Sequence, residues 1–89
     1  MTVTAELSLY PLTKDYEEPI ILFINKLKAH KALKVLTHSM STYVTGNNTE
    51  VFSAINSALE DIDSLGITVS LVMKIINKQL PVEAGFLDF

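Results

Sequence analysis

The chain has 89 residues, 48% of them hydrophobic, and its 7 basic and 10 acidic side chains give a net charge of −3. Every basic residue is a lysine and the lysines form no basic run, which argues against a nucleic-acid partner. There is no cysteine for disulfides or thiol chemistry. No stretch reaches the roughly 18 consecutive apolar residues of a membrane span, and the N-terminus lacks the pattern of a signal peptide, which together predict a cytoplasmic protein.

A chain of this length is expected to form one small domain with a modest core. A mean hydropathy of +0.31 is high for such a domain, and apolar surface that a small core cannot hide is often covered by another subunit. We therefore expect a homodimer or a homotetramer. The absence of Arg favours a neutral or cationic small ligand, because Arg is the side chain best suited to recognise phosphate and carboxylate groups.

The first half of the chain predicts a strand, a helix and two short strands. Residues 2–10 alternate between apolar and polar side chains, which is typical of a strand with one buried face, and a proline ends the pattern. Acidic residues and Pro19 then precede apolar side chains at helical spacing, and lysines follow them, which predicts a helix over 18–31. Residues 33–36 and 40–45 are expected to form short strands.

The second half predicts a helix and a fourth strand. The sequence Gly-Asn-Asn tolerates the positive φ angles of a turn, and we expect Asn48 or Thr49 to cap the helix that follows. The apolar stripe of this helix runs up to Gly66, which is placed for a C-terminal cap. Residues 67–76 alternate again as a fourth strand.

The order β-α-β-β-α-β predicts an α+β protein with a ferredoxin-like fold. In this fold two helices cover one face of a four-stranded antiparallel sheet. We assign residues 1–79 to this ligand-binding domain. Residues 80–89 form a hydrophobic tail that we expect to dock on the domain or on a neighbouring subunit.

The stretch THSMSTYVT, at residues 37–45, is rich in hydroxyl groups and contains no Asp, Glu, Lys or Arg. Strand parity places Ser41 and Tyr43 on the sheet face that the helices leave open, whereas Thr42 shares the parity of the buried Val44. The other polar side chains expected on this open face are Thr4, Glu6, Ser8, Tyr10, Thr45, Thr68, Ser70 and Lys74. The open face is therefore expected to present many hydroxyl groups around one carboxylate and one amine.

Each of these features also has a purely structural interpretation. Thr and Ser are common on solvated strands, Glu6 and Lys74 are placed for a cross-strand ion pair, and His38 lacks a second ligand at a metal-binding spacing. No Ser-His-Asp arrangement, glycine-rich phosphate loop or carboxylate pair indicates catalysis. We therefore expect no metal, no cofactor and no enzyme, and an enzyme with Glu6 or His38 as its base is the weakest alternative.

Three blocks of the sequence resemble a known family: ELSLYPLTKDY at residues 6–16, HSMSTYVTGNNTEVF at 38–52 and VSLVMKIINKQL at 69–80. They resemble the YkoF-like family, whose ferredoxin-like domains bind thiamine or hydroxymethylpyrimidine. The resemblance implies cytoplasmic binding of thiamine or its pyrimidine precursor without chemistry, alongside uptake or salvage of the vitamin. YkoF looks like a tandem of two such domains, and this chain is similar to one of them. The resemblance therefore also implies self-association, because two copies of this chain are needed to supply the same arrangement. More distant relatives have Pro-Met-Gly-Thr where this chain has Ser-Met-Ser-Thr at 39–42.

On this resemblance we assign ligand contacts to side chains on and beside the open face. The expected contacts are pyrimidine hydrogen bonds from Glu6, Ser8, Ser41 and Thr42, stacking or cation–π contacts from Tyr10 and Tyr43, and rim contacts from His38 and Asn77. Ser41 and Thr42 reach the same face only if a bulge or the hairpin bend brings them together. The alternative is a regulatory or scaffold domain that oligomerises through this face and binds no small molecule.

Overall fold

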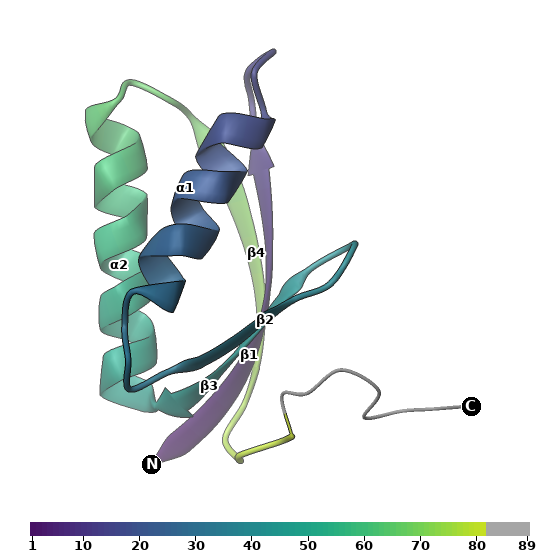
Figure 1. The fold of residues 1–89 in the computed structure, drawn as a ribbon, viewed down its shortest axis with the longest axis vertical. Helices are drawn as coiled ribbons and strands as arrows, with labels where there is room; N and C mark the ends of the chain where they lie inside the picture. The colour runs from purple at the N-terminus through teal and green to yellow at the C-terminus, as the bar shows by residue number, and fades with distance from the viewer. Residues whose placement is uncertain (82–89) are drawn as a thin grey trace.

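The computed structural model describes residues 1–81, and their helices and strands follow the predicted order. The elements are β1 (Thr2–Pro11), α1 (Glu17–Lys28), β2 (Lys34–Thr37), β3 (Thr42–Asn47), α2 (Asn48–Ser64) and β4 (Val69–Ile76). The strands form one antiparallel sheet in the order β2-β3-β1-β4, and both helices lie on the same side of it (Figure 1). This arrangement confirms the ferredoxin-like fold. Most of the predicted tail, residues 82–89, lies outside the described residues.

Two helix ends differ slightly from the predicted ones, and both differences follow from how the chain meets the sheet. α1 ends earlier than predicted, at Lys28, because the Leu33 N–H donates to the His30 carbonyl at 3.0 Å in a turn that returns the chain to the sheet. The N-cap of α2 is Asn47 rather than Asn48 or Thr49, because β3 continues directly into the helix. The Asn47 side-chain oxygen accepts the Thr49 N–H at 3.0 Å, which satisfies one of the free donors of the first turn.

The core lies between the sheet and the helices. Val3, Ala5 and Leu7 of β1 are each no more than 2% exposed, so the alternation predicted for this strand is confirmed. The helices contribute Phe23 and Leu27 of α1 and Val51, Ile55 and Ile62 of α2, and Val44 of β3 is also buried. Within residues 1–81, neither helix has the length and apolar composition needed to cross a membrane.

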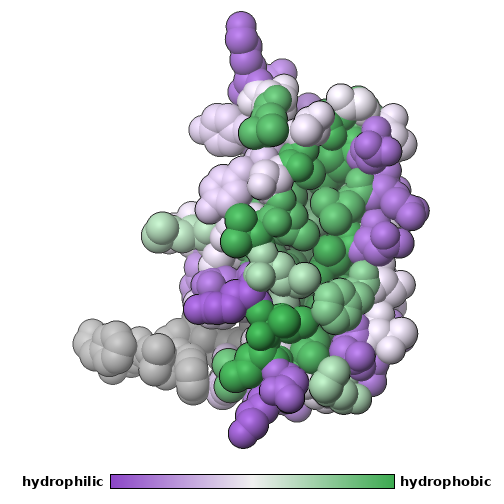
Figure 2. All heavy atoms as spheres, turned by 180° about the vertical axis from the view of Figure 1, so that it is seen from behind, coloured by the Kyte–Doolittle hydropathy of each residue, from purple (hydrophilic) through white to green (hydrophobic). Residues whose placement is uncertain are grey.

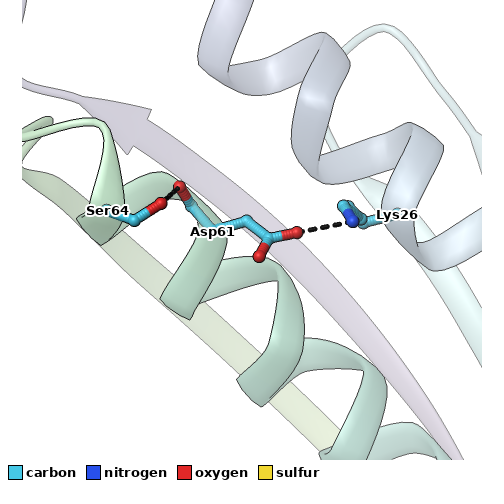
Figure 3. Close-up of polar contacts among 3 residues, drawn as sticks. All are labelled: Lys26, Asp61 and Ser64. Atoms are coloured by element: carbon cyan, nitrogen blue, oxygen red, sulfur yellow. Dashed lines mark hydrogen bonds and ion pairs between the residues drawn. The ribbon is translucent and has the colours of Figure 1, made fainter.

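An ion pair joins the two helices on their solvent side. The Lys26 ammonium nitrogen lies 2.6 Å from a carboxylate oxygen of Asp61, and the Ser64 hydroxyl donates to the Asp61 backbone carbonyl at 2.7 Å (Figure 3). The Lys26 and Asp61 side chains remain 45% and 40% exposed. Because solvent screens such a pair, it contributes at most about 1 kcal/mol to stability.

The edge strand β4 exposes apolar side chains on both faces of the sheet. β4 lies at the back of the molecule in Figure 1, and the view from behind in Figure 2 shows a long band of hydrophobic side chains. Val72 and Ile76 are 56% and 41% exposed, and Met73 and Ile75 on the helix side are 39% and 41% exposed. An unpaired apolar strand edge is the kind of surface through which proteins associate.

Candidate functional site

Strand register determines which side chains share the sheet face opposite the helices. Glu6 of β1 stands directly between Tyr43 of β3 and Lys74 of β4, and Thr4 stands opposite Ile76. Paired residues of antiparallel strands project to the same side of the sheet. The predicted polar side chains that belong to these paired strands therefore share the open face, and β4 adds apolar side chains to it.

The Glu6 carboxylate is held by a hydroxyl group. Ser41, in the loop just before β3, donates a hydrogen bond from its Oγ to Oε2 of Glu6 at 3.1 Å. Lys74 stands opposite Glu6, yet within residues 1–81 no contact of 4.0 Å or less joins their charged groups. The cross-strand ion pair considered from the sequence is thus not formed. The carboxylate is oriented by a donor and keeps its capacity to accept further hydrogen bonds.

Two more of the predicted residues, His38 and Tyr43, lie in the β2–β3 hairpin close to this carboxylate. The backbone N–H of His38 donates to the Ser41 carbonyl at 2.8 Å and closes the turn between the strands. The His38 ring packs against the ring of Tyr43, with centroids 4.6 Å apart and planes tilted by 57°. His38, Ser41, Tyr43 and Glu6 therefore form one connected cluster, which we call the Glu6 cluster.

A cavity of about 560 Å³ lies beside the Glu6 cluster. It is lined by Thr4, Ala5, Glu6, Tyr43, Lys74, Ile75, Ile76, Leu80 and Pro81. A volume of this order and a mainly apolar lining with a few polar groups are typical of small-molecule sites. Two further hollows, of about 480 and 410 Å³, lie at the helix ends and contain none of the predicted ligand contacts.

Apart from Thr42, the predicted site residues fall into three groups. Those at or next to the cavity are Glu6, Tyr43, Ser41 and His38. Ser8 and Tyr10 share the open face but lie further along β1, opposite Val72 and Ser70. Asn77 is exposed in the bend after β4 and does not line the cavity.

Thr42 lies on the other side of the sheet. It pairs with Leu7 of β1, is 6% exposed, and has its hydroxyl 3.4 Å from that of Thr37. β3 pairs with β1 in an uninterrupted register from residue 42 onward, so no bulge rotates Thr42 to the open face. Ser41 and Thr42 therefore project to opposite sides, and the expectation that both reach one ligand has to be corrected.

The sequence reasoning missed most of the apolar lining of the cavity. Strand parity was sufficient to place Ile76 beside Lys74 on the open face. Leu80 and Pro81 reach the cavity because the chain turns back over the sheet after β4, where the Leu80 N–H donates to Thr4 Oγ1 at 2.9 Å. No local pattern in the sequence indicates the direction of this turn.

The fold and the cavity define a ferredoxin-like domain with a hollow of small-molecule size on its open sheet face. The sequence profile of the YKOF-related family matches residues 2–76, and the chain belongs to this family. No curated protein sequence matches the chain.

Several solved structures share the fold. One from Thermotoga maritima, provisionally assigned to thiamine biosynthesis or salvage, has a TM-score of 0.76 at 20% identity, covering 88% of this chain and 85% of that chain. A Streptococcus pneumoniae protein has a TM-score of 0.77 at 19% identity, covering 90% of each chain. A hypothetical protein from Methanocaldococcus jannaschii has a TM-score of 0.66 at 27% identity, covering 88% of this chain and 81% of that chain.

Proposed function

We propose that this protein binds thiamine or its hydroxymethylpyrimidine precursor in the cavity beside the Glu6 cluster and does not catalyse a reaction. The observation that carries the proposal is a carboxylate oriented by Ser41 at the edge of a cavity that Tyr43 also lines. Membership of the YKOF-related family supports the choice of ligand. So does the fold shared with the Thermotoga protein, which is provisionally assigned to thiamine biosynthesis or salvage.

The residue types around the cavity match the chemistry of an aminopyrimidine. Its exocyclic amine is a donor, which the Glu6 carboxylate accepts, and its ring nitrogens are acceptors, to which the Lys74 ammonium group donates. The Tyr43 ring offers an aromatic surface to the pyrimidine, and the packed His38 ring restricts the movement of Tyr43. No group in this set needs to transfer a proton for the ligand to bind.

The charges on the open face also favour one orientation of bound thiamine. Its thiazolium ring is a cation and is disfavoured beside the Lys74 ammonium group. Ser8 and Tyr10 follow Glu6 on the same face of β1, at about 7 Å and about 14 Å from Glu6 along the strand, and Tyr10 is 54% exposed. In the proposed complex the pyrimidine occupies the cavity, and the thiazolium extends toward Tyr10, whose ring attracts a cation.

A titration of Glu6→Gln tests this assignment. Gln has the size of Glu and still accepts from Ser41, so the change removes charge from the site with little loss of packing. We expect the Kd for both ligands, measured by calorimetry, to rise at least about tenfold, because hydrogen bonds to charged groups contribute roughly 1.5–3 kcal/mol. Glu18→Gln, on the exposed first turn of α1, is the matched control and should change the Kd less than twofold. The absence of heat and of a thermal shift with both ligands at millimolar concentration would refute the proposal.

The exposed apolar surface of β4 favours a second candidate, an oligomeric scaffold or regulatory domain without a small-molecule ligand. We propose that the protein is a cytoplasmic homodimer or homotetramer in either case, and that as a binder it acts in uptake or salvage of the vitamin. Ser41→Ala separates the two candidates in a combined calorimetry and light-scattering experiment. Loss of ligand affinity with an unchanged molar mass supports the binder, whereas dissociation of the oligomer supports the scaffold.

A further inference from the structure

The Thr4 side chain on the open face forms two hydrogen bonds with the segment that follows β4. The Thr4 hydroxyl donates to the Lys78 carbonyl at 2.9 Å and accepts the Leu80 N–H at 2.9 Å. Its other neighbour is the Thr45 hydroxyl at 3.1 Å, which itself donates to the Val3 carbonyl at 2.9 Å. Thr4 thus satisfies both backbone groups of the turn, as a neighbouring strand would.

The turn covers one end of a face that is otherwise accessible. Thr4 and Thr45 are only 8% and 3% exposed, whereas Glu6 and Tyr43, the next pair along the same strands, are half-buried. Leu80 and Pro81 stand at this covered end and line the cavity. We call these two side chains the end wall.

We propose that Thr4 is a positioning residue that fixes the end wall, and that the end wall recognises the 2-methyl group of the pyrimidine ring. This inference rests on the proposed function. In the aminopyrimidine of thiamine, the 5-substituent carries the thiazolium or the hydroxyl group, and the 2-methyl group lies on the opposite side of the ring. When the 5-substituent points toward Tyr10, the methyl group points toward Leu80 and Pro81.

The end wall has the chemistry for this contact. Both side chains are apolar and present no donor or acceptor to the ligand, so they favour a methyl group over water or a polar substituent. Leu80 is 39% exposed without a ligand, which leaves apolar surface available for a guest. The hydroxyl of Thr4 holds the wall through the backbone of the turn, and it therefore acts on the ligand only through the position of Leu80 and Pro81.

The test compares two ligands, 4-amino-5-hydroxymethyl-2-methylpyrimidine and the same molecule without the 2-methyl group, by calorimetry. For the wild-type protein we expect the methylated ligand to bind about fourfold more tightly, the factor expected for burial of one methyl group. Leu80→Ala and Thr4→Val should each reduce this ratio to near one. Thr4→Ser, which keeps the hydroxyl, should retain it. Thr37→Val is the matched control, because it removes an exposed hydroxyl at the other end of the sheet.

Amide exchange of Leu80 provides a readout that does not depend on the ligand. We expect its exchange to accelerate in Thr4→Val and to stay slow in Thr4→Ser, because only the first loses the acceptor of the Leu80 N–H. Unchanged exchange in Thr4→Val overturns the role of Thr4. If wild type, Leu80→Ala and Thr4→Val bind both pyrimidines and the ratio of the two affinities is the same in all three, recognition by the end wall is overturned. The proposed function remains intact in that case. Failure of the wild-type protein to bind either pyrimidine overturns both.

Discussion

Ser41→Ala should weaken ligand binding, whereas Thr42→Val should not, although the two residues are adjacent. Ser41 donates to the Glu6 carboxylate on the open face, whereas Thr42 is buried on the helix side next to Thr37. Removing the Ser41 hydroxyl leaves the carboxylate without its orienting donor. We expect the Kd for hydroxymethylpyrimidine to rise about three- to tenfold, equivalent to roughly 0.7–1.4 kcal/mol, the range of one ordinary hydrogen bond.

Thr42→Val should leave ligand affinity unchanged within a factor of two and should not destabilise the protein. The contact between the two threonine hydroxyls spans 3.4 Å, so it contributes less than the roughly 1 kcal/mol of a well-formed hydrogen bond. The exposed Thr37 hydroxyl can turn to water, and the new methyl group is buried with a gain of about 0.8 kcal/mol. The net change is a stabilisation below about 1 kcal/mol, or a rise in Tm below about 8 °C for a domain of this size. Calorimetry measures the ligand affinity of both variants, and thermal denaturation measures their stability. An affinity loss in Thr42→Val as large as that in Ser41→Ala would refute the assignment of these residues to opposite faces.

Three further predictions concern stability and are read from thermal and urea denaturation. Gly46→Ala should destabilise the protein by about 1–3 kcal/mol, because the added methyl carbon would lie 2.6 Å from a terminal carbon of the buried Leu33; an unchanged urea midpoint would show that Leu33 moves aside freely. Asn47→Ala should cost about 0.5–2 kcal/mol through loss of the α2 cap, and Asn47→Asp, which keeps the capping oxygen, should restore the Tm. Lys26→Ala should lower stability by no more than about 1 kcal/mol at low salt, and its difference from wild type should shrink in 1 M NaCl; a larger, salt-independent loss would contradict the view that its pair with Asp61 is screened.

Local sequence patterns were sufficient for the fold because each element repeats its signal over several residues. The alternation of Val3, Ala5 and Leu7 specifies both a strand and its buried face, and a shift by one residue would expose the whole row. The ends of the elements were less accurate. They depend on single turns, such as the one between His30 and Leu33 that ends α1, and single turns carry little periodic signal.

The same parity rule predicted part of the candidate site. It placed Glu6, Ser41 and Tyr43 on one face, where the structure brings them together. It also placed Thr42 on the opposite face unless a bulge intervened. The answer came from the register of β3 against β1, which has no bulge at this position. Because a bulge is a property of two paired strands, the sequence of one strand does not reveal whether it is present.

The sequence by itself determined the order of the elements, the faces of the strands and the family to which the chain belongs. Only the tertiary structure decided that the supposedly open face has a covered end, where Thr4 binds the turn that carries Leu80. The two residues are far apart in the chain, and their contact depends on β1 and β4 pairing in one particular register. Periodicity reports which side of an element is buried, but the shape of a cavity depends on contacts between distant segments, and these form only when the sheet is assembled.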